Sequence, residues 1–187
     1  MAPKKCIERM IKTHELTFGQ KPTVNVHSPL EKNDHPELND SESLDRKGIE
    51  QHQSLIGQLQ WAISIECFDI STAVATMSGF RAAPRRGHLD RVKRICGCLA
   101  RMKSAVIRLQ THLPDCSDIP EQQQDWYSTY GNVREMIPND APMPLGKAVR
   151  LMHYVDANPL HDALTGRSMM GILHFVNGTP IGWHAKK

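Results

Sequence analysis

The chain lacks long apolar runs and is poor in aromatic residues. None of its 187 residues belongs to an apolar stretch approaching the roughly 20 residues that a helix needs to cross a bilayer. The N-terminal sequence MAPKKCIERM carries charges where a signal peptide has its apolar core. We therefore expect no membrane partner and an intracellular location, in the cytoplasm or the nucleus, rather than secretion.

The chain also lacks the motifs of a zinc site or of a hydrolase. Its five cysteines include no C-x-x-C pair, and Cys96 and Cys98, two apart on an expected helix, point to different faces. The ten histidines show no H-E-x-x-H spacing, and His35-Pro36-Glu37 lacks the downstream P-C-x-x-C of zinc deaminases. A phosphate-binding glycine loop and a nucleophile–base motif are missing as well. An intact small hydrolase therefore has no motif to support it.

Basic residues are concentrated in one segment. The net charge is only +3, yet residues 81–103 contain eight Arg or Lys against one acid, Asp90. Apolar periodicity predicts a helix here, with arginines away from its apolar stripe. Two interpretations stay open, a solvated charged face or a polyanion-binding surface, although faces that serve solubility alone usually mix both signs. The candidate nucleic-acid contacts are Arg85, Arg86, Arg91, Arg94 and Arg101.

A helical period dominates the first half of the chain. Apolar residues spaced by three and four positions predict helices over 3–16, 49–63, 69–80 and from residue 88 onward. Asp69 is expected to cap the third of these helices. The polar, proline-bearing segment 20–48 shows no period and is interpreted as a connection. The sequence AVIRLQ, residues 105–110, alternates like a strand.

The period changes to two near the C-terminus. Strands are predicted at 149–156, 169–176 and 179–184, with Asn177-Gly178 as the two-residue turn of a hairpin. A segment rich in Pro, Asp and Gln, residues 111–148, is interpreted as a linker or insertion. The expected fold class is therefore α+β, with a helical unit, a linker and a separate antiparallel sheet.

The C-terminal strands carry a specific succession of residues. Asp-Ala is followed by a second Asp, by Ser and Gly before an apolar strand, and by Ile-x-Trp-x-x-Lys-Lys. The positions are Asp156, Ala157, Asp162, Ser168, Gly171, Ile181, Trp183, Lys186 and Lys187. This succession resembles the first part of the ribonuclease H domain of copia-type retrotransposon polyproteins.

Residues 52–99 extend the resemblance upstream. They contain a Leu-Ile-Gly helix, an Asp-Ile helix and a helix led by Pro-x-x-x-His, the order found after the polymerase palm of that family. The resemblance thus implies the end of a reverse transcriptase palm, a connecting segment, a helical thumb-like unit, a linker or insertion, and the N-terminal part of an incomplete ribonuclease H-like domain. These regions span residues 1–19, 20–48, 49–110, 111–148 and 149–187.

Asp156 has two explanations. From the residues alone, Asp-Ala-Asn-Pro is ordinary turn chemistry at a strand end. By the resemblance, Asp156 is the first-strand carboxylate that helps to hold catalytic magnesium. Asp162 is expected to be a loop or capping residue rather than a ligand. Partner acids are not found after it, so we expect no tight magnesium binding by this chain alone.

The resemblance implies a function that the chain holds only in part. The family's Tyr-x-Asp-Asp polymerase motif is missing, because no Asp-Asp pair occurs. We expect a fragment of a reverse transcriptase and ribonuclease H that lacks flanking polyprotein segments, binds an RNA–DNA hybrid or other nucleic acid, and has no complete active site. The alternative is a non-catalytic nucleic-acid-binding or interaction module derived from such an element.

Overall fold

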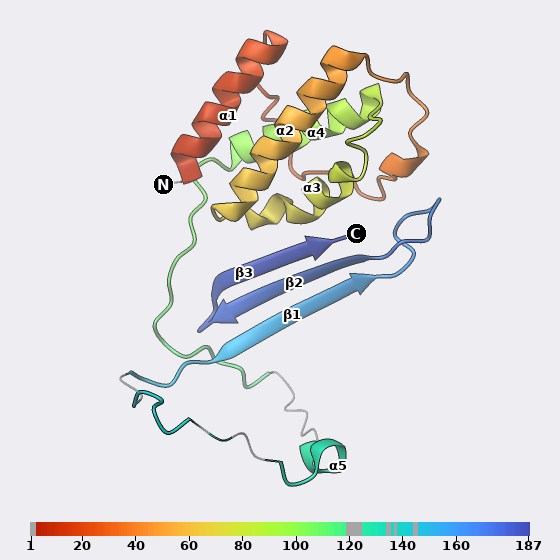
Figure 1. Cartoon of the computed structure of the whole chain (residues 1–187). Helices are drawn as coiled ribbons and strands as arrows, with labels where there is room; N and C mark the ends of the chain where they lie inside the picture. The colour runs from red at the N-terminus through yellow and green to blue at the C-terminus, as the bar shows by residue number, and fades with distance from the viewer. Residues whose placement is uncertain (1–2, 119–124, 134–135, 137, 144–145) are drawn as a thin grey trace.

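Two layers, one of helices and one of strands, make up the protein. The computed structural model describes residues 3–118, 125–133, 136, 138–143 and 146–187. Helices α1 to α4 lie over a three-stranded antiparallel sheet, and a long excursion leads from α4 to the first strand (Figure 1). The segregation of helices and strands along the chain confirms the predicted α+β class.

The helical layer forms where the apolar period is helical. Its elements are α1 (Pro3–Phe18), α2 (Arg46–Ser64), the short turn η2 (Phe68–Ile70), α3 (Ser71–Ser78) and α4 (Arg86–Arg101). Helix α2 begins earlier than predicted because the Asp45 side chain accepts a hydrogen bond from Gly48 N at 2.8 Å and caps its N-terminus. Asp69 does not cap α3 as predicted, because it lies within η2 and the cap position is Ile70.

The hydrophobic core lies between these four helices. The predicted stripes on the second, third and fourth helices are buried, with Leu59, Met77 and Val92 fully inaccessible to solvent. Helix α1 adds Ile7 and Met10 to the same cluster. The core therefore forms without the sheet, whose side chains do not belong to this cluster.

The sheet is a meander in the order β1-β2-β3. Its strands are β1 (Leu151–Asn158), β2 (Met169–Val176) and β3 (Thr179–Lys186), and both pairings are antiparallel. The turn between β2 and β3 is the predicted Asn177-Gly178, with positive φ angles of 48° and 79°. Two successive positive φ angles are the geometry that favours Asn-Gly in a two-residue hairpin.

The connections differ from the predictions at two places. The predicted strand at 105–110 is wrong, because this segment has no regular structure. Alternation alone does not make a strand, and here Val106 and Leu109 point into solvent beside no neighbouring strand of the described chain. The excursion that follows contains one short described helix, α5 (Trp126–Tyr130), whereas the connection before α2 holds the single turn η1 (Pro36–Leu38).

The sheet is not separate from the helices. The Trp183 side chain of β3 donates a hydrogen bond from Nε1 to Ile63 O at 3.0 Å, and its ring lies 5.1 Å from that of Phe68. The β1–β2 loop also contacts the connecting segment, because Ala163 N donates to Glu37 Oε1 at 2.9 Å. Side chains far apart in the sequence therefore join the two predicted units, although the sheet stays outside the helical core.

In the part of the chain that the structure describes, no helix combines the length and the apolar character that crossing a bilayer requires.

Candidate functional site

Asp156 lies inside β1 rather than at its end. The ladder with β2 continues through Ala157 and Asn158, which pair with Met170 and Met169. The prediction that the strand stops at Asp156 is wrong, and turn chemistry therefore does not explain this residue. The chain leaves the ladder only after Asn158, so backbone pairing fixes the position of the Asp156 side chain.

A groove runs beside Asp156 between the sheet and the helical layer. It encloses about 440 Å³, and Asp156 and Tyr154 line one side while Phe68, Asp69 and Thr72 line the other. Asp156 pairs with Gly171 on β2, a residue without a side chain, which leaves this part of the groove open. Asp156 is exposed to solvent. A solute can therefore reach its carboxylate.

Asp69 is the acid that sequence reasoning did not connect with Asp156. It belongs to η2, the turn that leads into α3, and it lines the same groove. The two residues stand far apart in the sequence and line one groove only because the sheet docks on the helices. The Asp-Ile motif of the sequence could have pointed to Asp69 as a site residue, because the Asp69 carboxylate does not cap α3 in the structure.

The acids near Asp156 do not form a complete metal centre. Among the described residues, no group of three or more His, Cys, Asp or Glu side chains is close enough to hold one ion. The groove offers the two carboxylates of Asp156 and Asp69. Magnesium prefers near-octahedral oxygen coordination and keeps water in the positions that the protein does not fill. Such an ion would have mostly water around it here.

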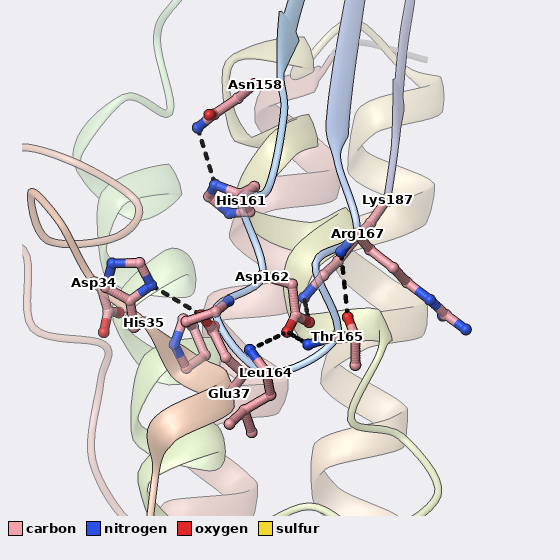
Figure 2. A network of polar contacts seen from close by, with 12 residues as sticks. Asp34, His35, Glu37, Asn158, His161, Asp162, Leu164, Thr165, Arg167 and Lys187 are labelled. Carbon is pink, nitrogen blue, oxygen red and sulfur yellow. Dashed lines mark hydrogen bonds and ion pairs between the residues drawn. The ribbon is translucent and has the colours of Figure 1, made fainter.

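Asp162 is a capping residue, as predicted. Its Oδ1 accepts hydrogen bonds from Leu164 N at 3.0 Å and Thr165 N at 2.8 Å, and its Oδ2 forms a 2.7 Å ion pair with Lys187 (Figure 2). The Lys187 ammonium and the Thr165 N–H hold the pKa of Asp162 far below its usual range. Its carboxylate is thus fully occupied in closing the β1–β2 loop.

A second polar contact fixes this loop from the other side. Glu37, on the short turn η1, accepts hydrogen bonds from His35 Nδ1 at 2.8 Å and from Ala163 N at 2.9 Å (Figure 2). Burial opposes the charged form of Glu37, but the N–H of Ala163 and the His35 ring lower its pKa below the usual value. The charged form of Glu37 therefore ties the connection to the sheet.

Acids from the connecting segment neutralise part of the basic helix. Arg91 forms a bidentate pair with Asp34, at 2.8 Å from Nε to Oδ2 and 2.6 Å from Nη2 to Oδ1. These hydrogen bonds raise the pKa of Arg91. Arg94 pairs with Glu31 at 3.0 Å. The inference that this face lacks compensating acids is wrong, because charges counted within the segment omit acids that stand far upstream in the sequence.

Two more candidate arginines hold the backbone of the same segment. Arg85 Nη1 donates to Ser41 O at 2.6 Å, and Arg101 Nη1 donates to Val26 O at 3.4 Å and lies 2.9 Å from His27 Nδ1. Arg86 is exposed, and its side chain has no polar partner in the described part of the chain. Four of the five predicted nucleic-acid contacts therefore also have a structural role, whereas Arg86 has none.

The buried cysteines do not provide a nucleophile. Burial raises the pKa of Cys67 to about 11 and that of Cys96 to about 12. A thiol must lose its proton to react, so these two cysteines are inert at neutral pH. The hypothesis of a small hydrolase gains nothing from them.

Comparison with known proteins gives no match, because no protein-family model, no curated protein and no solved structure is significantly similar to this chain. The fold and site define an α+β protein with an accessible carboxylate on the first strand of an antiparallel meander. The resemblance to copia-type polyproteins therefore stays a prediction from the sequence pattern.

Proposed function

We propose that the chain is part of a copia-type reverse transcriptase and ribonuclease H polyprotein, and that it binds an RNA–DNA hybrid without cutting it alone. The observation that carries this proposal is the placement of Asp156 in an open groove on the first strand of the meander. This placement is compatible with the metal-ligand role that the resemblance gives to Asp156. The proposal covers RNA-directed DNA synthesis and hybrid cleavage only in the longer protein.

We expect no hybrid cleavage by this chain alone because the groove contains too few carboxylates. In-line attack on a phosphodiester needs metal ions held in a fixed geometry on the attacking and leaving oxygens. Asp156 and Asp69 are the two acids that line the groove. In the described part of the chain, no third His, Cys, Asp or Glu side chain completes a metal-binding group with them. Two carboxylates give a magnesium affinity on the order of millimolar at best, by analogy with weak oxygen-ligand sites.

Hybrid binding would use the arginines that are most accessible. Arg86 has no side-chain partner in the described residues, and Arg101 is exposed. Arg91 would first have to release Asp34, a pair that is mostly buried, and this makes it a poor first contact. We therefore assign the initial phosphate contacts to Arg86 and Arg101. Arg85, Arg91 and Arg94 would contact phosphates only after these two.

Fluorescence anisotropy with a labelled RNA–DNA hybrid tests the binding. The Arg86→Glu/Arg101→Glu variant should bind more weakly, and the log–log salt slope should shrink by about 0.9 for each phosphate that the variant no longer neutralises. A matched control, Lys12→Glu/Arg167→Glu, changes the net charge equally at exposed positions elsewhere. Equal affinity and equal slope in both variants would refute the assignment of these arginines.

Incubation of the same hybrid with magnesium tests the catalytic part. We expect no cleavage by the chain. Cleavage that disappears in Asp156→Asn would show that the site is complete after all, whereas cleavage that persists in this variant would contradict the role of Asp156 as well.

A second candidate is a non-catalytic nucleic-acid-binding module. The internal pairing of Arg91 with Asp34 and of Arg94 with Glu31 favours it, because these contacts let the helical layer fold together with its own connection. A module of this kind should bind duplex DNA as well as the hybrid. Strong preference for the hybrid would favour the polymerase-derived function.

A further inference from the structure

Two histidines face each other on the side of the sheet opposite to Asp156. His153 of β1 and His174 of β2 are direct partners in the antiparallel register, three positions from Asp156 on β1. Side chains alternate between the two faces of a strand, so His153 shares its face with Leu151 and Val155. Both of these residues are more than half exposed. The pair is therefore open to solvent, and neither histidine lines the groove beside Asp156.

The rings of His153 and His174 converge on their Nδ1 atoms. These atoms lie 2.6 Å apart, and the rings meet edge to face with their centroids at 4.8 Å. One Nδ1 must carry the proton while the other accepts it, since two protonated or two bare nitrogens would repel at this distance. Two nitrogen atoms that could bind a metal ion therefore lie side by side.

Gly182 gives the His174 ring its room. It pairs with His174 from β3, and a Cβ at residue 182 would lie 3.2 Å from Cδ2 of the imidazole. Gly182 does not have a positive φ angle, so the backbone does not require glycine here. The missing side chain instead leaves space in which the ring of His174 can adjust.

We propose that His153 and His174 bind a zinc ion through their Nδ1 atoms. Imidazole nitrogens suit borderline-soft divalent ions, with Zn–N bonds of about 2.0–2.1 Å and a tetrahedral N···N separation of roughly 3.3 Å. The observed separation is 2.6 Å, so the rings must part by about 0.7 Å, which a small χ rotation provides.

Zinc binding to the two histidines does not require the loss of a proton. The Nδ1–H···Nδ1 hydrogen bond breaks, two Zn–N bonds form, and the ring that carried its proton on Nδ1 carries it on Nε2 instead. Water fills the other two positions, because no third His, Cys, Asp or Glu of the described chain joins the pair. The site is therefore one of moderate affinity at the surface.

Isothermal titration of the whole chain with Zn²⁺ tests the proposal. His153→Asn and His174→Asn should each weaken the zinc site at least about tenfold, or about 1.4 kcal/mol. His184→Asn is the matched control, because His184 is an exposed histidine on β3 of the same sheet. Cu²⁺ should bind more tightly than Zn²⁺ to the same pair, and Mg²⁺ should not bind there.

A spectroscopic measurement on the unmodified chain keeps the test independent of any effect of the variants on folding. Zinc should shift the Nδ1 resonances of His153 and His174 in ¹⁵N NMR and leave that of His184 unchanged. Zinc binding that is equal in the His153→Asn/His174→Asn variant, or shifts confined to other histidines, would overturn the proposal.

Discussion

At the scale of single residues, His52 is an unusual member of the core. It lies on α2, its side chain is fully buried, and neither ring nitrogen has a hydrogen-bond partner among the described residues. Burial, followed by the positive charges of His88 and Arg81, lowers the pKa of His52 to about 4 from 6.5. The folded protein therefore contains His52 in its neutral form at neutral pH, whereas the unfolded chain takes up a proton on this residue first.

The titration of His52 predicts a loss of stability in mild acid. Above about pH 6.5 the residue is neutral in both states; as the pH falls toward about 4, the unfolded state is favoured by up to about 3 kcal/mol. His52→Leu should reduce this loss between about pH 6.5 and pH 4, because leucine does not titrate, while His14 and His88, whose pKa values burial also lowers, still contribute. Urea unfolding at several pH values measures it, with the exposed His112→Leu as control. An unchanged pH profile in His52→Leu would contradict the prediction.

At the scale of elements, α4 and the connecting segment fit together closely. Arg91 and Arg94 pair with acids of the segment, and Gly97 lets its backbone approach the helix. A Cβ at residue 97 would overlap with the carbonyl of Thr23. The segment that the sequence marks as a connection is therefore held along α4 by both charge and shape.

Two glycine substitutions separate close packing from helix propensity. Gly97→Ala should destabilise the protein by about 1–3 kcal/mol, because the backbone of Thr23 must move away. Gly57→Ala on α2 is the matched control, since nothing lies within 4 Å of its added Cβ, and it should stabilise by about 0.5–1 kcal/mol. Urea unfolding measures both, and a gain in stability for Gly97→Ala would show that the segment does not pack there.

At the scale of the whole molecule, the sheet depends on a few contacts with the helical layer and with the segment that follows α4. Trp183 bonds to Ile63, Gln110 N donates to Thr179 Oγ1 at 2.7 Å, and Lys187 lies 5.6 Å from the centre of the Phe80 ring. The helices have a continuous core, which the sheet does not share. The free energy that holds the sheet should therefore be smaller than that of the helical layer.

Removal of Trp183 should release the sheet before the helices. Trp183→Ala should cost about 2 kcal/mol, less than in a full core because the side chain is only half-buried. Native-state hydrogen exchange should show faster exchange in β1–β3 and unchanged protection in α2 and α4. The exposed Tyr127→Ala serves as control. Equal loss of protection in both layers would mean that they unfold as one unit.

The sequence by itself determined the elements whose signal is local. The stripes of α2, α3 and α4 follow from spacing of three and four, and Asn177-Gly178 fixed the hairpin because few residues adopt two positive φ angles. The capping role of Asp162 was predictable for the same reason, since its partners Leu164 and Thr165 are its neighbours in the chain.

Only the tertiary structure decided which distant residues meet. Packing pairs Arg91 with Asp34 and places Asp69 and Asp156 along one groove. Packing also buries His52 without a hydrogen-bond partner among the described residues. The strand predicted at 105–110 failed likewise, because its alternating pattern needs a neighbouring strand. Local periodicity specifies which face of an element is apolar, but the free energy of docking selects what covers that face.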